Sequence, residues 1–193
     1  MKRTLGICLL CAGALLMTGC SNKFEPTEST LFVTSKGMVY SAVMEPFEAA
    51  YYNYEELAED VQNAVSAYCG ETSLEAVTVE SLVEENDMVT LLMHYETVDD
   101  YAKFNEVILF SGTLSEAMEA GYRPEHLLDA DGEPAELNIE EHGALKVVVT
   151  EENVCVQTTG KIKFVSDNVS IIDSKLAKIM EAGESELAFV LYK

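Results

Sequence analysis

Four carboxylates between positions 129 and 140 have the spacing most suggestive of metal chemistry. Asp129, Asp131 and Glu133 occupy alternate positions, and Glu140 is the twelfth residue counted from Asp129. Carboxylates at alternate positions of a loop, with a glutamate at the twelfth place, can converge on Ca²⁺. The sixth place, which needs a sharp turn, is Pro134, whose ring fixes φ. The spacing therefore favours an ordinary acidic turn over a calcium site, and we predict no metal centre.

A cysteine nucleophile is the second chemistry to consider. Cys69 could use His94 or His126 as a base, but it falls near the end of a predicted helix, where the helix dipole does not lower a thiol pKa. His94 alternates onto a mixed face of a predicted strand, where we expect a hydrogen-bonded structural histidine. His126 and His142 are too scattered for a zinc site. We therefore assign no catalytic residue and no cofactor, and the alternative is a hydrolase with a carboxylate or Cys/His site.

The first nineteen residues have the layout of an export signal. Lys2 and Arg3 give a positive start, residues 5–17 form an apolar segment, and small residues follow. Thirteen helical residues span about 20 Å, short of the roughly 30 Å hydrocarbon core of a bilayer. The sequence thus predicts a signal peptide, residues 1–19, that is cleaved and not kept as a membrane span.

The end of this leader, Leu16-Met17-Thr18-Gly19-Cys20, resembles the lipobox of bacterial lipoprotein precursors. The resemblance implies that a diacylglyceride is attached to the Cys20 thiol, that the chain is cut just before it, and that Cys20 becomes an N-terminus carrying palmitate-type chains. Several acyl chains on one residue give stable anchoring. We therefore expect an exported, lipid-anchored protein of the bacterial membrane or envelope that faces outward from the cytoplasm. An ordinary secretory signal with an incidental cysteine is the alternative.

Cys69 and Cys155 are the cysteines that follow Cys20, because Cys8 and Cys11 lie in the leader. An exported chain can hold a disulfide, but a bridge needs two α-carbons within about 7 Å. A Cys69–Cys155 disulfide and two separate, buried thiols are the alternatives.

Acidic residues dominate the composition, with 34 Asp and Glu against 12 Lys and Arg and a formal net charge of −22. Binding to nucleic acid depends on basic residues that neutralise phosphates, so nucleic acid is excluded as a partner. An anionic membrane surface would also repel the chain, which leaves the lipid as the means of attachment. The acids are spread along the sequence, as is typical of a soluble surface.

Three tyrosines, Tyr51, Tyr52 and Tyr54, form the densest aromatic group in the chain. Such a group can bind a sugar or a peptide, and it can equally belong to the core and its lid. We treat the three as candidate ligand-binding residues.

The first half of the chain predicts two hairpins and a helix. Alternating apolar residues indicate hairpins at 31–44, with Gly37 in the turn, and at 77–95. Between them a helix is expected to begin after Asn53 and to stop at Gly70. Short helices follow at the segments 98–104 and 114–120.

The second half is more strand-like. Residues 121–143 are irregular, and we expect a long surface excursion there. The segments 145–150 and 154–158 suggest a further hairpin, residues 175–180 fit a helix or a strand, and residues 187–192 are apolar enough for an inner strand.

Short strands with two or three segregated helices indicate an α+β fold, an antiparallel sheet of hairpins with helices packed on one face. We expect one domain at 31–193, which is long enough to bury its own core, after a linker at 20–30. Segments such as 101–105 and 163–169 are similar to those of uncharacterised bacterial envelope lipoproteins, a resemblance that implies no activity. The sequence predicts a non-enzymatic binding or interaction module displayed by acylated Cys20, with the membrane and an unknown envelope protein or ligand as partners.

Overall fold

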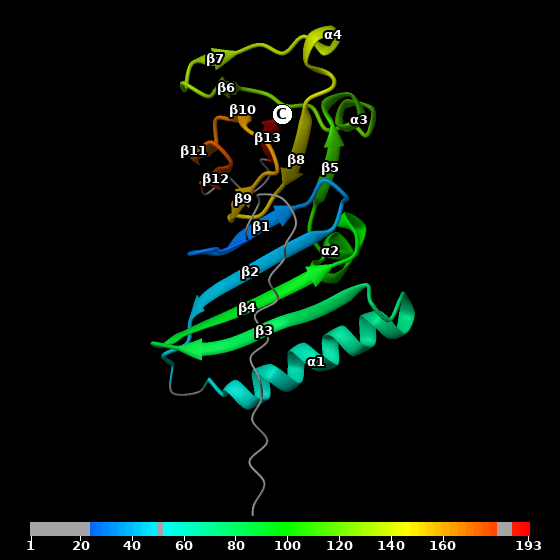
Figure 1. Ribbon diagram of the computed structural model, residues 1–193, viewed down its shortest axis with the longest axis vertical. Helices are drawn as coiled ribbons and strands as arrows, with labels where there is room; N and C mark the ends of the chain where they lie inside the picture. Colours follow the sequence, from blue (N-terminus) through cyan, green and yellow to red (C-terminus); the bar gives the residue numbers. More distant parts are fainter. Residues whose placement is uncertain (1–23, 50–51, 181–186) are drawn as a thin grey trace, which may run out of the picture.

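The structure, a computed structural model, describes residues 24–49, 52–180 and 187–193, and within them the predicted α+β fold is confirmed (Figure 1). The signal peptide, Cys20 and Tyr51 lie outside the described residues. The strands are β1 (Thr30–Val33), β2 (Val39–Pro46), β3 (Val77–Glu85), β4 (Met88–Tyr95), β5 (Leu109–Thr113), β6 (Leu127–Asp129), β7 (Pro134–Ala135), β8 (Lys146–Thr150), β9 (Cys155–Gln157), β10 (Ile162–Ser166), β11 (Val169–Asp173), β12 (Leu176–Ile179) and β13 (Ala188–Tyr192). The helices are α1 (Tyr54–Glu71), α2 (Val98–Asn105), α3 (Leu114–Glu119) and α4 (Ile139–His142).

These strands form two sheets, where the sequence suggested one. The seven-stranded sheet has the order β11-β12-β9-β1-β2-β4-β3, and the six-stranded sheet has the order β5-β8-β13-β10-β6-β7. Neighbouring strands within the described residues are antiparallel except β1 and β9, which are parallel. The chain passes back and forth between the sheets after β8 (Figure 1). The seven-stranded sheet therefore combines β1 to β4 with three strands from the end of the sequence, whereas the six-stranded sheet holds only strands that follow residue 108.

Polar caps start the helices where the sequence indicates. The Asn53 side chain accepts hydrogen bonds from the first turn of α1, Thr97 caps α2, and Thr113 with Glu116 forms a capping box at α3. The expected stop at Gly70 is wrong, because α1 runs on to Glu71 and the hydroxyl of Thr72 donates to the Tyr68 carbonyl 2.8 Å away. No helix in the described ranges is both long and apolar enough to cross a bilayer.

The two early hairpins are confirmed. β1 pairs with β2, and Gly37 has the positive φ of 83° that its turn requires. β3 pairs with β4 through a two-residue turn in which Asn86 and Asp87 both have positive φ, the conformation that matches the twist of a tight hairpin. Local turn chemistry therefore determines these pairings.

The hairpin expected at 145–158 is wrong. β8 lies in the six-stranded sheet between β5 and β13, whereas β9 lies in the seven-stranded sheet between β1 and β12. The segment 151–154 is therefore a crossing between sheets. The undecided segment 175–180 contains the strand β12, which pairs with both β9 and β11.

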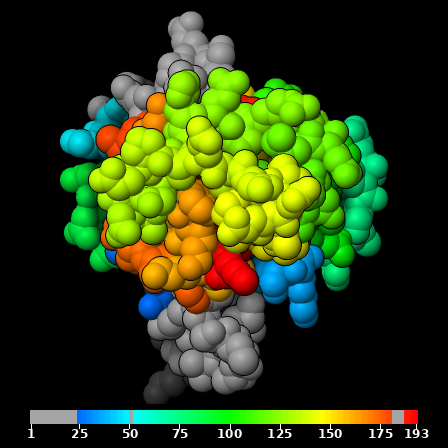
Figure 2. All heavy atoms as spheres, turned by 90° about the horizontal axis from the view of Figure 1, so that it is seen from above, coloured from blue at the N-terminus to red at the C-terminus, as the bar shows by residue number. Residues whose placement is uncertain are grey.

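The excursion at 121–143 contributes to a sheet instead of staying wholly on the surface. β6 pairs with β10, and Leu127 within it is buried. β7 then pairs with β6, and α4 follows it. Figure 2 shows this segment, in yellow-green and yellow, spread over one end of the molecule.

The six-stranded sheet is buried on both faces, which explains its continuous apolar strands. Along β13, Val190 and Tyr192 join a core shared with the seven-stranded sheet, while Phe189 and Leu191 join a second core with Leu114 of α3. The predicted inner strand at the end of the chain is therefore confirmed, since β13 lies between β8 and β10.

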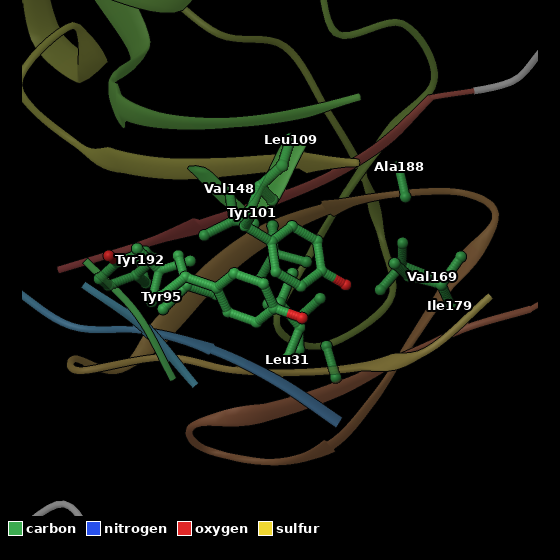
Figure 3. Close-up of a cluster of buried hydrophobic side chains, with 14 of the residues drawn as sticks. Leu31, Tyr95, Tyr101, Leu109, Val148, Val169, Ile179, Ala188 and Tyr192 are labelled. Carbon is green, nitrogen blue, oxygen red and sulfur yellow. The ribbon is translucent and has the colours of Figure 1, made fainter. Parts of the chain in front are cut away.

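The shared core joins the two sheets face to face. Leu31 of β1 and Tyr95 of β4 meet Leu109, Val148 and Tyr192 of the six-stranded sheet in it (Figure 3). The Tyr95 and Tyr101 rings pack edge to face with centroids 4.8 Å apart, an arrangement that adds to the burial energy of aromatic pairs.

Candidate functional site

Three of the four carboxylates considered for calcium, Asp129, Asp131 and Glu133, lie in one hairpin turn. The Asp129 carboxylate accepts hydrogen bonds from the backbone N–H groups of Asp131 and Glu133, at 2.9 and 3.0 Å, and so closes the β6–β7 hairpin. Glu140 lies apart from them in α4. In the described part of the chain no three His, Cys, Asp or Glu side chains are grouped to hold a metal ion.

The structure does not bring Cys69, His94 and His126 together. Cys69 lies on the inner side of α1, where its thiol donates to the Val77 carbonyl 3.4 Å away. His94 points to the opposite face of the seven-stranded sheet and stacks on Tyr40 with centroids 4.7 Å apart. His126 precedes β6 in the other sheet. The hydrogen bond expected for His94 is not present at its Nε2, which is buried without a partner in the described residues.

Cys69 and Cys155 are free thiols in the structure. Cys155 is buried in β9 and hydrogen-bonds through its thiol to the Glu28 carboxylate. Burial, followed by the negative charge of Glu28, raises the pKa of the Cys155 thiol to about 11. A thiol with such a pKa stays protonated near neutral pH and is a poor nucleophile.

The tyrosine group does not form one platform. Tyr54 donates its hydroxyl to the Leu82 carbonyl 2.7 Å away and thereby ties the start of α1 to β3. Tyr52 stacks on Phe47 with centroids 4.9 Å apart and remains 47% exposed. Of the three candidates, Tyr52 therefore offers an open ring and Tyr54 is structural, while Tyr51 lies outside the described residues.

The residues before β1 are packed against the seven-stranded sheet. We call residues 24–29 the N-terminal arm. The Phe24 ring stacks on Phe32 and tilts against Tyr40, with centroids 5.9 and 6.1 Å apart. The Ser29 hydroxyl accepts from the Met44 N–H at 2.9 Å and donates to the Met44 carbonyl at 3.2 Å. The described part of the expected linker is thus held to β1 and β2.

An ion pair fixes the arm at its other side. The Glu28 carboxylate pairs with the Lys178 ammonium of β12, which lowers the pKa of Glu28. Beside this pair lies a hollow of about 290 Å³ whose lining includes Met44, Met88 and Cys155. Its charged groups already satisfy one another, so the hollow offers a ligand mainly apolar contact.

A second hollow of about 370 Å³ lies on the six-stranded sheet, beneath the segment 121–143. Its lining is Leu114, Met118, Pro124, His126, Leu127, Ala135, Glu136, Leu137 and Ile139. We call it the apolar hollow. It contains one imidazole and one carboxylate but no hydroxyl, thiol or amine among the described lining residues, and Ile139 remains 43% exposed. These groups suit an apolar side chain better than a reaction.

A partly buried carboxylate, Glu152, belongs to the lining of neither hollow. Glu152, in the crossing between β8 and β9, accepts the Tyr101 hydroxyl through both its oxygens, at 3.0 and 2.9 Å. Burial raises the pKa of Glu152, and the neighbouring charge of Glu151 adds to this, against the lowering effect of the Tyr101 hydrogen bond. The same burial and carboxylate raise the pKa of Tyr101.

Replacing Glu152 with glutamine should change how stability depends on pH. Because the folded-state pKa of Glu152 is raised above 4.5, its protonation favours folding. This contribution is full below about pH 4.5 and is lost as the pH rises through the folded-state pKa. Relative to Glu152→Gln, the natural protein should therefore gain stability on acidification. The difference between the two unfolding midpoints should therefore move in favour of the natural protein as the pH falls, and at this chain length 1 kcal/mol moves a midpoint by roughly 2–4 °C.

Thermal unfolding followed by circular dichroism between pH 4.5 and 8 measures this effect. Glu125→Gln is the matched control, because it removes the same charge at an exposed position. A difference between the natural protein and Glu152→Gln that stays constant with pH would contradict the expectation.

Comparison with known proteins gives no match: no family model, no curated protein and no solved structure is significantly similar to the chain.

Proposed function

We propose that the chain is a lipid-anchored protein of the bacterial envelope whose domain binds a partner without catalysing a reaction. The lipobox-like segment ending at Cys20 carries the proposal, because it attaches everything that follows to a membrane surface. The packing of the N-terminal arm supports it, since an anchored domain that is held close to its attachment point stays at the membrane.

The apolar hollow is the surface on which this partner would bind. Its volume of about 370 Å³ suits one or two large apolar side chains. Met118 and Leu137 line it from α3 and from the segment between β7 and α4. An envelope protein that inserts an apolar side chain here would bury apolar surface on both partners. Each Å² of that surface removed from water would contribute roughly 25 cal/mol to the free energy of binding.

A photo-crosslinking amino acid at Ile139 tests this proposal in living cells. With the full lipidated chain, position 139 should give a discrete crosslinked product with an envelope protein. The same probe at Ile172, an exposed residue of β11 at the edge of the seven-stranded sheet, should give none.

The product should depend on the chemistry of the hollow. Met118→Asp places a carboxylate in the lining, and burying an unpaired charge costs several kcal/mol. The crosslink at position 139 should therefore fall about tenfold or more at unchanged protein abundance. Equal products at both probe positions, or a product indifferent to Met118→Asp, would reject the hollow as the binding surface.

A further inference from the structure

The seven-stranded sheet has one face that is turned away from the shared core, and we call it the outer face. Leu31, Val39, Met93 and Val77 point into the core, so their neighbours along β1, β2, β4 and β3 point outward. The pairing register places these outward residues in three rows that run across the strands. The first row is Phe32, Tyr40, His94 and Thr78. The second row contains Ala42, Leu92 and Ser81, and the third contains Met44, Thr90 and Val83.

The outer face is rich in apolar and aromatic side chains, although it points away from the core. Phe32 stacks on both Phe24 and Tyr40, Phe24 tilts against Tyr40, and His94 continues the series across β4. Phe32 is buried, Tyr40 is partly buried, and Val83 is 48% exposed. Aromatic rings with a polar tip, such as tyrosine, are favoured where one end meets an apolar medium and the other meets water.

No acidic residue occupies the three outward rows, although the chain holds 34 Asp and Glu. Glu85 lies at the end of β3. Glu80, at the bulge of that strand, lies near Tyr40, where burial and then the charge of Glu80 raise the pKa of the tyrosine hydroxyl. The acids concentrate elsewhere. Helix α1 packs against the core side through Val65 and Tyr68 and carries exposed glutamates such as Glu55, on the opposite side of the sheet from the outer face.

The N-terminal arm sets the distance between this face and the anchor. Phe24 is fixed on the outer face, and four residue steps separate it from Cys20. A fully extended chain covers about 14 Å in four steps. The headgroup layer on each side of a bilayer is roughly 5–8 Å thick. An acyl chain attached to Cys20 therefore holds Phe24 within or just above the headgroups.

We propose that the outer face, through Phe24 and Tyr40, rests in the interfacial layer of the bilayer that holds the acylated N-terminus. The inference rests on the proposed lipid anchor. The three rows hold no acidic side chain, and beside them Glu28 and Lys178 neutralise each other as an ion pair. This face can therefore approach a surface that would repel the acidic remainder of the domain. The apolar hollow, on the far side of the six-stranded sheet, is then turned away from the membrane toward partners.

The chain contains no tryptophan, so one introduced tryptophan reports on one position. The full lipidated protein is reconstituted into phosphatidylcholine vesicles that carry bromine near the headgroup end of the acyl chains. We expect Tyr40→Trp to lose roughly half of its fluorescence or more to the bromine, as an interfacial indole would. Tyr122→Trp, which replaces a partly buried tyrosine whose ring tilts against Phe110 of the six-stranded sheet, should keep its intensity.

Three results would overturn the inference. Flotation of the vesicles distinguishes a failure of this inference from a failure of the proposed lipid anchor. If the protein floats with the vesicles but neither tryptophan is quenched, the anchor stands and the orientation fails. If both are quenched equally, no face is preferred. If the protein does not float, the anchor itself fails. Leu92→Trp, in the next outward row, repeats the measurement should Tyr40→Trp not fold.

Discussion

Replacing Cys20 with alanine is expected to abolish acylation and with it the firm attachment of the protein to the membrane. The thiol of Cys20 is the group to which a diacylglyceride would be linked, and alanine offers no nucleophile in its place. The expected effect is all or none: labelled palmitate enters the natural chain and none enters Cys20→Ala.

Another cysteine of the leader can be replaced as a control. Cys11→Ala removes a cysteine from the apolar segment and should leave palmitate incorporation, cleavage and membrane recovery unchanged. Mass spectrometry of the natural protein should then find a modified Cys20 at the N-terminus. An unmodified cysteine, or label that persists in Cys20→Ala, would remove the basis of the proposed function.

Features that depend on neighbouring residues could be predicted from the sequence. Gly37 supplies a positive φ for the β1–β2 turn, and Asn53 and Thr97 cap α1 and α2, so these elements follow from chemistry within a few positions. The α+β class follows from the same local patterns. Apolar continuity also predicts the inner position of β13, since a strand buried on both faces needs no polar alternation.

Features that depend on distant partners could not be predicted in this way. β8 and β9 are each recognisable as strands, but no local signal assigns them to different sheets. The parallel pairing of β9 with β1 joins residues more than a hundred positions apart. The residues near either strand carry no pattern that identifies a partner so distant in the chain. The expected hairpin at 145–158 failed for this reason.

The two surfaces on which the proposals rest also could not be recognised from the sequence. Phe24 stands in a polar stretch that resembles a linker, and only its stacking on Phe32 and Tyr40 shows that the stretch is fixed. The apolar hollow combines α3 with β6 and β7, whose spacing in the chain gives no hint that they meet. In α3 the pair Leu114 and Met118, four positions apart, is a local signal of an apolar helix face, but its partner could not be inferred.

Truncating Leu191 to alanine is expected to cause the largest loss of stability among single core changes proposed for this protein. Leu191 is fully buried in β13 and packs in the second core with Leu114 and Phe189. Removing such a side chain costs the transfer free energy of its methyl groups and leaves a cavity, together about 2–5 kcal/mol. Urea unfolding followed by circular dichroism measures this loss.

Leu74→Ala is the matched control, because the same atoms are removed from a side chain that is 89% exposed, and a change within about 0.5 kcal/mol is expected. The comparison also tests the architecture. The second core exists only because α3 and the segment 121–143 cover the far face of the six-stranded sheet. If that cover were absent, Leu191 would face water and Leu191→Ala would cost little more than Leu74→Ala. A large difference between the two variants therefore requires the covered sheet on which the apolar hollow is built.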